Sequence, residues 1–492
     1  MTDPSPPAAA ASPPSMNTLR ERYGDRYRWL LLLSVMVGTM ASIMSSTIVN
    51  VAIPDMSRHF ALGQERAQWV SSGFMVAMTV SMLTTPWLLS RYGYRRTYVG
   101  TMVLLLVGGV LGGLSSVFWL VLVARVAEGL AAGVVQPIPA IIILRAFEPH
   151  EQGRASGIFG MGVVLAPAIG PSIGGVLVDL FGWRSIFFMV VPFCLASLWL
   201  AYKFVPTTAP GGVAAARQGG IDWRGLLLGT VGTLCLLNGL VELRGNAPLE
   251  AALLLAGAAA SLAVFIWWQK RLAAAGGEPL MNMALFGYRQ FAMGSVVAFI
   301  YGTALFGSTY LLPVYMQVAL HLSASHVGTI MLPAGIVLAF TIAGVGRLAD
   351  RQPTWILVSI GLLLLAVSFA LMTVLHLRSP IWPLVVFAII GRIGLGFILP
   401  SLNLGSMRPL AKPLIPQGAS AISFVRMLGG AAGVSLCAIV LEWRLAAHGD
   451  SLASSLTSAA RLEAFNEVFV MLAGLCALAI CAAWQLREKR TP

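Results

Sequence analysis

The chain has 492 residues, of which 58% are hydrophobic and 10% are charged. Soluble domains are about 45–50% apolar and about a quarter charged, so this chain has too few polar side chains to cover a water-facing surface. The composition excludes a soluble enzyme and a nucleic-acid-binding protein, although the formal net charge is +13. We therefore expect an integral membrane protein.

The N-terminal segment differs from the rest of the chain. Residues 1–17 are rich in Pro, Ala and Ser, and four Arg residues stand just before the first long apolar run. This pattern favours a disordered cytoplasmic tail over residues 1–28, followed by an uncleaved first helix, rather than a signal peptide.

Fourteen apolar runs of about 20 residues follow the tail, and this is the length that a helix needs to cross the hydrocarbon core of a bilayer. They lie near residues 29–53, 69–90, 98–117, 119–141, 157–178, 185–204, 225–243, 250–268, 291–315, 326–346, 354–376, 382–401, 417–441 and 465–486. The runs predict an all-α polytopic protein with fourteen transmembrane helices.

The distribution of positive charge predicts the orientation of these helices. With a cytoplasmic N-terminus, most of the 32 Lys and Arg residues fall in the inner loops and tails, as positive residues do in membrane proteins. An even number of helices returns the C-terminal tail, residues 487–492, to the same side. We expect both termini in the cytoplasm. The strong excess of Arg over Lys suggests a GC-rich bacterial genome, and hence the bacterial inner membrane.

Two similarities within the chain indicate a repeat. Residues 88–92 resemble residues 348–352, and Arg125 matches Arg392 at a similar offset. Two parallel helical halves with a binding site between them are a known transporter architecture. The predicted organisation is a six-helix bundle (29–204), a cytoplasmic linker (205–224), two extra helices (225–270), a second cytoplasmic linker (271–290) and a second six-helix bundle (291–486).

Several short motifs occur in order along the chain. They are STIVNVAIP at residues 46–54, RVAEG at 125–129, APAIGPSIGG at 166–175 and GWR at 182–184, followed by Leu312-Pro313, Gln317, Leu332-Pro333, and Arg426 with Gly429-Gly430. In this order and spacing the chain resembles the fourteen-helix drug:proton antiporter family of the major facilitator superfamily. The resemblance implies alternating-access export of hydrophobic or cationic drugs in exchange for protons.

The motif in the fifth predicted helix is rich in Gly and Pro. Its residues Pro167, Gly170, Pro171, Gly174 and Gly175 lower helical propensity, and Gly allows a neighbouring backbone to approach closely. Ordinary small-residue packing explains this composition, and so does a pliant seam between the halves. The resemblance favours the seam.

Two inner loops carry related basic motifs. The first holds Arg91, Gly93 and Arg95, and the second holds Gly346, Asp350 and Arg351. In the resembled family, an acidic residue in the first loop meets a helix end and latches the outward-facing state. Here Ser90 occupies that acidic position, which puts the first latch in doubt, whereas the second loop retains its Asp.

Proton coupling in the resembled family usually involves an acidic residue in the first helix, where this chain has Ser45. Glu128 is the one carboxylate that we place deep within a predicted span, and Arg125 lies three residues earlier on the same helical face. A carboxylate in hydrocarbon must find a partner, face a cavity or take up a proton. Arg125 and Glu128 are therefore either a structural ion pair or the proton-coupling site.

Two further arginines, Arg392 and Arg426, lie within predicted spans without an acidic residue one helical turn away. They either compensate helix C-termini or bind anionic groups in the cavity. Polar and aromatic residues that are candidates for substrate binding are Ser45, Asn50, Trp69, Gln136, Tyr301, Tyr310, Gln317 and Asn403. Interhelical hydrogen bonding or ordinary packing explains each of them equally well.

The sequence leaves three alternatives to drug:proton antiport. A symporter or uniporter of one endogenous lipid precursor or metabolite is favoured modestly by the missing first-helix acid. A membrane enzyme is disfavoured because no hydrolase, zinc-protease or phosphate-binding motif occurs. A non-transporting receptor on the same scaffold is the third.

The expected ligands are small hydrophobic substrates, protons and membrane lipid, with no cofactor, metal or nucleic acid. The five Cys residues lie in apolar runs without metal or redox spacing. In a bacterium with two membranes, such pumps can work with a periplasmic adaptor and an outer-membrane channel, but no feature of the sequence identifies either.

Overall fold

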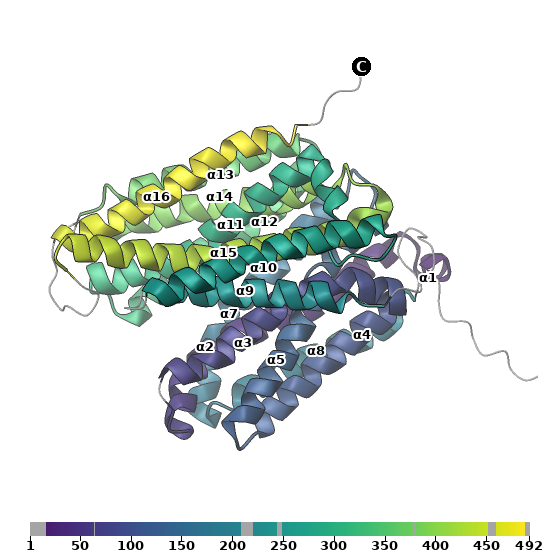
Figure 1. Cartoon of the computed structure of the whole chain (residues 1–492), viewed down its shortest axis with the longest axis horizontal. Coiled ribbons are helices and arrows are strands. Elements are labelled where there is room, and N and C mark those ends of the chain that lie inside the picture. The colour runs from purple at the N-terminus through teal and green to yellow at the C-terminus, as the bar shows by residue number, and fades with distance from the viewer. Residues whose placement is uncertain are drawn as a thin grey trace, which may run out of the picture.

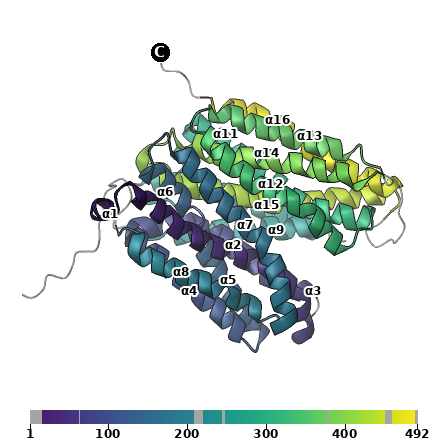
Figure 2. The ribbon, with the colours of Figure 1, turned by 180° about the vertical axis from the view of Figure 1, so that it is seen from behind.

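The computed structural model describes residues 16–62, 64–207, 220–243, 248–376, 379–450 and 459–487. This described part is helical, without a strand, as its composition and apolar runs predict. Figures 1 and 2 show two groups of long helices, the earlier part of the chain in one and the later part in the other.

The first group contains the N-terminal bundle. Its helices are α2 (Tyr27–His59), α3 (Gln64–Ser81), α4 (Thr85–Leu114), α5 (Phe118–Val135), α6 (Ile138–Ala146), α7 (Gln152–Phe181) and α8 (Ser185–Phe204). A 3-10 turn, η2 (Met82–Thr84), joins α3 to α4. Helix α4 is interrupted at Gly93, whose φ of 78° lies in the left-handed region that favours glycine.

Two helices, α9 (Trp223–Glu242) and α10 (Pro248–Ala274), pack against each other between the bundles in sequence. Asp222 caps α9 by accepting a hydrogen bond from the backbone N–H of Gly225. Helix α9 also contacts α3 and α15, so the pair lies along the side where the two bundles meet.

The second bundle is formed by α11 (Arg289–Val314), α12 (Ala324–Leu348), α13 (Thr354–Met372), α14 (Ile381–Met407), α15 (Ile415–Ala447) and α16 (Ala459–Trp484). One π-helical turn, η4 (Tyr315–Ala319), extends α11. The most extensive packing within this bundle is between α11 and α15 and between α13 and α14.

Twelve segments of the described chain are long and apolar enough to cross a membrane. One of them, Trp69–Leu114, is twice the usual length and contains the interruption at Gly93. The 30-residue helix α7 is not among the twelve. The multi-pass helical fold is confirmed, while the count of fourteen spans stays a prediction.

The start of the chain corrects one expectation. Within the segment 1–28 that we expected to be disordered, Met16–Tyr23 forms helix α1, and Leu19 of this helix is buried in the main hydrophobic core. The apolar side chains spaced within this charged segment give α1 one face that can pack. Residues 1–15, most of the predicted linker 205–224 and residues 488–492 lie outside the described part.

The two bundles touch chiefly through α7 and α12, with smaller contacts from α15 to α3, α4 and α6. Helix α1 and the C-terminal end of α16 lie at the same end of the molecule (Figures 1 and 2). The loops that join α6 to α7 and α12 to α13 meet at that end, which we call the terminal end.

Candidate functional site

The centre of the N-terminal bundle holds an ion pair. Arg125 and Glu128 on α5 are 1% and 0% exposed, and the Nη1 of Arg125 lies 2.6 Å from the Oε2 of Glu128. Their spacing of three residues places both side chains on one face of the helix, as the sequence predicts. This buried pair is the centre of the candidate site.

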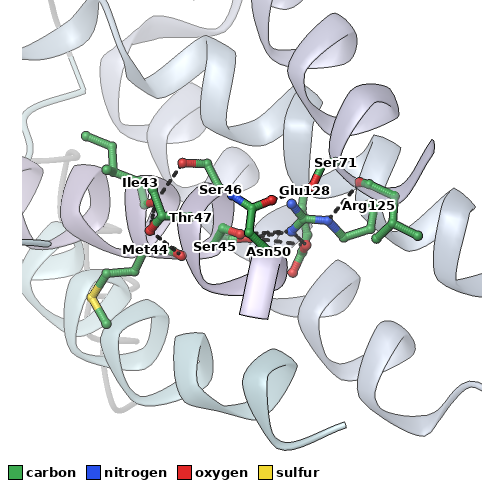
Figure 3. A network of polar contacts seen from close by, with 10 residues as sticks. Ile43, Met44, Ser45, Ser46, Thr47, Asn50, Ser71, Arg125 and Glu128 are labelled. Carbon is green, nitrogen blue, oxygen red and sulfur yellow. Dashed lines mark hydrogen bonds and ion pairs between the residues drawn. The ribbon is translucent and has the colours of Figure 1, made fainter. Parts of the chain in front are cut away.

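Helix α2 supplies a hydroxyl to both members of the pair. The Oγ of Ser45 accepts a hydrogen bond from Arg125 at 2.8 Å and donates one to the Oε2 of Glu128 at 3.2 Å. Arg125 also donates to the backbone carbonyl of Ser45 at 3.1 Å. Figure 3 shows this network between α2 and α5. Ser45 therefore belongs to the same site as Arg125 and Glu128.

Helix α3 supplies the remaining contacts of the guanidinium. The Nε of Arg125 donates to the carbonyl of Val70 at 3.3 Å, and the guanidinium lies 4.2 Å from the centre of the Phe74 ring. A cation above an aromatic face is attracted by the ring quadrupole. Neither contact was predicted, because a backbone carbonyl and one aromatic residue in an apolar helix give no distinct sequence signal.

Helix α4 makes room for the carboxylate. A Cβ atom on Gly108 would lie 2.7 Å from the Cγ of Glu128, closer than real Cβ contacts occur. Glycine at this position thus lets α4 approach α5 with a glutamate between them.

Two polar atoms of the pair are buried without a hydrogen bond in the described structure, the Oε1 of Glu128 and the Nη2 of Arg125. An unmade hydrogen bond on a buried charged group is costly. Half of the carboxylate is therefore left for a proton or for a ligand that reaches it.

A second polar contact lies farther along α2. The hydroxyl of Ser71 on α3 donates to the Oδ1 of Asn50 at 2.8 Å, and both residues are drawn in Figure 3. Asn50 is exposed, in contrast to Ser45. Of the predicted substrate-binding residues, Ser45 and Asn50 thus lie on the same helix, about 1.4 turns apart.

A cavity of about 1160 Å³ lies beside this network, between α3, α4, α5, α9 and α15. Trp69, which is 52% exposed, Ser71 and the α5 residues Val126 and Leu130 line it. Arg125 and Glu128 do not line it. Of the predicted substrate-binding residues, Trp69 alone is among the residues that line this cavity.

The second-loop motif joins the two bundles at the terminal end. The carboxylate of Asp350 accepts hydrogen bonds from the backbone N–H groups of Gly153 (2.6 Å) and Arg154 (2.8 Å) in the first turn of α7. The N-terminus of a helix attracts negative charge. Burial raises the pKa of the Asp350 carboxyl, while these N–H groups and nearby Arg408 lower it by a smaller amount.

Gly346 lets α12 cross α7 closely beside this contact. A Cβ on Gly346 would collide with the backbone of Gly153 and Gly157. Arg351, the remaining member of the predicted motif, is exposed. Two basic residues that we did not assign also bridge the bundles here, with Arg145 donating to the carbonyl of Lys412 and Arg408 to that of Pro149. The positive-inside pattern predicts on which side of the membrane such residues lie, but it does not predict their contacts.

Among the described residues, no hydrogen bond or ion pair joins the first-loop motif to the second bundle. Ser90 donates its hydroxyl to the carbonyl of Trp87 in its own helix, and Arg91 is exposed. Arg95 donates to the carbonyl of Tyr202 and lies over its ring, within the same bundle. Gly93 forms the bend that interrupts α4. The asymmetry expected from Ser90 is therefore present in the structure.

The Gly and Pro motif of α7 lies against α2 in the half of the helix far from the terminal end. Cβ atoms on Gly170 and Gly174 would meet Thr47 and Ile48, and Gly175 lies near Val51. The side chains of Pro167 and Pro171 lie outside the described residues.

Arg392 on α14 and Arg426 on α15 interact electrostatically with the phenol of Tyr301 on α11. These three residues form a second polar group in the C-terminal bundle. The other predicted residues are dispersed: Gln136 ends α5, exposed Gln317 lies in η4, and the partly buried Tyr310 and Asn403 lie on α11 and α14.

In the part of the chain that the structure describes, no group of three or more His, Cys, Asp or Glu side chains is arranged to hold a metal ion. The five cysteines are free thiols, and three of them are buried.

Comparisons with known proteins agree with this architecture. A multidrug resistance protein B homolog of Mycobacterium tuberculosis (strain ATCC 25618 / H37Rv) is 29% identical over 448 residues, which are 88% of this chain and 80% of that protein. The lincomycin resistance protein LmrB of Listeria monocytogenes is 23% identical over 420 residues, 84% of this chain and 86% of that protein. The solved structure of the proton:xylose symporter XylE superposes with a TM-score of 0.67 at 12% identity and covers 94% of this chain and 96% of that one.

A family model named Major Facilitator Superfamily matches residues 35–434. This match includes the buried ion pair, the contact of Asp350 with α7 and the arginines of the second bundle. The chain belongs to the major facilitator superfamily and is a membrane transporter.

Proposed function

We propose that this transporter exports hydrophobic compounds across the bacterial inner membrane in exchange for protons, and that Glu128 carries the proton. The observation that carries the proposal is the position of Glu128, which is fully buried beside Arg125 with one carboxylate oxygen left without a hydrogen bond. Buried ionisable groups within a membrane span are candidates for functional sites.

The position of Ser45 supports this assignment. The resembled antiporters usually carry an acid at that position of the first helix, and here the Ser45 hydroxyl lies 3.2 Å from the Glu128 carboxylate. The carboxylate thus occupies the same neighbourhood but is contributed by α5 instead of α2.

Arg125 can tolerate a change of charge on Glu128. When Glu128 is ionised, it pairs with Arg125; when it is protonated, Arg125 still has the oxygens of Ser45, the carbonyl of Val70 and the face of Phe74. Protonation of Glu128 therefore removes one contact of the guanidinium and leaves the others in place. A site that keeps Arg125 in contact with partners in both protonation states of Glu128 can bind and release the proton as the conformation changes.

The contacts between the bundles support alternating access. Asp350, Gly346, Arg145 and Arg408 hold the bundles together at the terminal end, which is the cytoplasmic end in the predicted orientation. The Gly-rich half of α7 beyond Gly170 packs on α2 of its own bundle instead. We assign this arrangement to the outward-facing state, with fourteen spans and both termini in the cytoplasm.

The names of two relatives support export of toxic compounds, since one is called a multidrug resistance protein homolog and the other a lincomycin resistance protein. Their identities of 29% and 23% leave the substrate of this chain open.

The proposal is tested by proton-coupled flux in proteoliposomes. Purified protein is reconstituted, a pH gradient is imposed, and uptake of a cationic probe (ethidium), an anionic probe (11-(dansylamino)undecanoic acid) and its neutral methyl ester is followed by fluorescence. We expect gradient-dependent flux of at least one probe in the wild type and its loss in Glu128→Gln.

The matched control is Asp179→Asn, since Asp179 is an exposed carboxylate on α7 of the same bundle. The double variant Arg125→Gln/Glu128→Gln removes both buried charges. If it elutes from a gel-filtration column as the wild type does and also lacks gradient-dependent flux, misfolding does not explain the loss. Gradient-dependent flux that persists in Glu128→Gln would return the pair to a structural role. Flux in the wild type that does not depend on the pH gradient would favour a uniporter.

A further inference from the structure

The C-terminal bundle contains two arginines without counter-charges. Arg392 on α14 is 9% exposed, and Arg426 on α15 is half-buried. Neither guanidinium has an ion pair or a hydrogen bond among the described residues, in contrast to Arg125 in the first bundle. The side-chain nitrogens of Arg392 and Arg426 are not fully buried, so a ligand can reach them.

Tyr301 of α11 shares this region. Its side chain is 3% exposed, and both arginines act on its phenol electrostatically. Its hydroxyl has no hydrogen bond among the described residues, and it is not fully buried. Three hydrogen-bond donors from three helices thus lie near one another, and none has an acceptor among the described residues.

The carboxylates of this bundle are committed elsewhere. Asp350 is bound to the first turn of α7, Glu467 pairs with Arg444, and Asp450 pairs with Arg461. Along α15, the first acidic residue after Arg426 is Glu442, about 24 Å away at 1.5 Å per residue. Within the described bundle, no acidic side chain is placed to neutralise Arg392 or Arg426.

Close packing fixes the backbone that carries these donors. A Cβ on Gly302 of α11 would collide with the carbonyl of Arg426, and the hydroxyl of Thr303 donates to the carbonyl of Gly429 at 2.9 Å. Donors that are mounted on rigid, closely packed helices are held ready for a ligand.

Two uncompensated cations within a membrane protein are costly unless an anion joins them. Guanidinium groups bind carboxylate and phosphate in a bidentate manner, and a phenol adds one further donor. A cationic compound would be repelled from this region by the same charges. The ligand chemistry that fits is therefore anionic.

We propose that Arg392, Arg426 and Tyr301 bind the anionic head group, a carboxylate, phosphate or sulfonate, of an amphiphilic substrate. This inference rests on the proposed export function and names its substrate class. It replaces the cationic compounds implied by family resemblance with amphiphilic anions.

Equilibrium binding, which does not depend on transport, tests the proposal. The full-length protein is placed in phosphatidylcholine nanodiscs and titrated with three dansyl probes of equal chain length that carry a carboxylate, a methyl ester or a quaternary ammonium group. We expect the carboxylate to bind at least about tenfold more tightly than the other two. Equal binding of the three probes, or preference for the ammonium probe, would overturn the proposal.

Variants then assign the site. Arg392→Gln and Arg426→Gln should each weaken binding of the carboxylate probe by about tenfold or more and leave the ester unchanged. Arg392→Lys, which keeps the charge but loses the planar fork, should weaken it less. Arg271→Gln removes the same charge from an exposed position on α10, outside the three helices that carry the site, and should have no effect. A uniform weakening of all three probes in the Gln variants would refute a head-group site.

The source of the anion is decided by competition. If 30% phosphatidylglycerol in the nanodisc displaces the carboxylate probe, the head group is that of a membrane lipid; if it does not, the site takes a smaller amphiphile. Carboxylate-selective binding in a wild-type protein that shows no gradient-dependent flux would keep this inference and reject the proposed antiport. Gradient-dependent flux without any preference for the anionic probe would keep the proposed antiport and reject this inference.

Discussion

At the scale of single residues, the Arg125–Glu128 pair is the most constrained feature of the molecule. Both side chains are almost fully buried, and their charges balance each other. Removing one member of a buried ion pair leaves the other as an uncompensated charge and costs about 3–5 kcal/mol. We expect Arg125→Gln to lower the free energy of unfolding by about that amount, measured by SDS titration in mixed micelles.

The double variant Arg125→Gln/Glu128→Gln should recover much of this loss, because two neutral side chains replace two buried charges. Arg58→Gln breaks the exposed pair of Arg58 with Asp55 and should change stability far less. A double variant that is as unstable as the sum of its single changes would mean that the charges are stabilised independently of each other.

Part of this site could be predicted from sequence. The three-residue spacing of Arg125 and Glu128 on one apolar run is enough to place them in contact. Their contacts with Ser45, Val70 and Phe74 come from α2 and α3, and two of the three are made by a backbone carbonyl or a ring that resembles any other apolar residue. Such contacts depend on how the helices pack, which no local pattern encodes.

At the scale of elements, the crossing of α7 and α12 depends on Asp350 at the N-terminus of α7. The closed arrangement holds the Asp350 carboxyl at a raised pKa because it is buried. Separation of the bundles would return the carboxyl to water and its pKa to the ordinary value. The closed arrangement therefore binds a proton at a pH where the open one does not, so acidification from neutral pH should favour closure.

Electron–electron distance measurements between spin labels at Glu148→Cys and Gln352→Cys, in a background of Cys235→Ser and Cys481→Ser, can follow this equilibrium. We expect the short-distance population to grow as the pH falls and to become insensitive to pH in Asp350→Asn. The positive charge of His150 lowers the pKa of the Asp350 carboxyl, so His150→Gln serves as the control and should keep the response. An unchanged pH response in Asp350→Asn would show that another group titrates.

The helices themselves were largely predictable because apolar runs of membrane length admit few other structures. Their interruptions were less so. Gly93 breaks α4 with a left-handed backbone, whereas Pro54, Pro192 and Pro333 lie inside helices that continue. Proline is tolerated in membrane helices when neighbours satisfy the freed backbone groups, so its presence alone does not end a helix.

At the scale of the whole molecule, the two bundles repeat one plan but carry different charges. The first holds a balanced pair, Arg125 and Glu128, and the second holds Arg392 and Arg426 without counter-charges among the described residues. The repeat was visible in the sequence as the match of Arg125 with Arg392. The imbalance was not, because it depends on where every carboxylate of the second bundle lies in space.

If the bundles rock about a central site, fixing their contact at the terminal end should stop transport without preventing binding. The backbone N–H of Arg154 on α7 binds Asp350, the neighbour of Arg351, and both arginine side chains are exposed. Arg154→Cys and Arg351→Cys, in the background of Cys235→Ser and Cys481→Ser, should react with a short bismethanethiosulfonate linker. We expect the linked protein to lose flux, regain it on reduction and bind the dansyl carboxylate throughout, while each single-cysteine protein is unaffected. Full flux in the linked protein would mean that transport does not require the bundles to separate at this end.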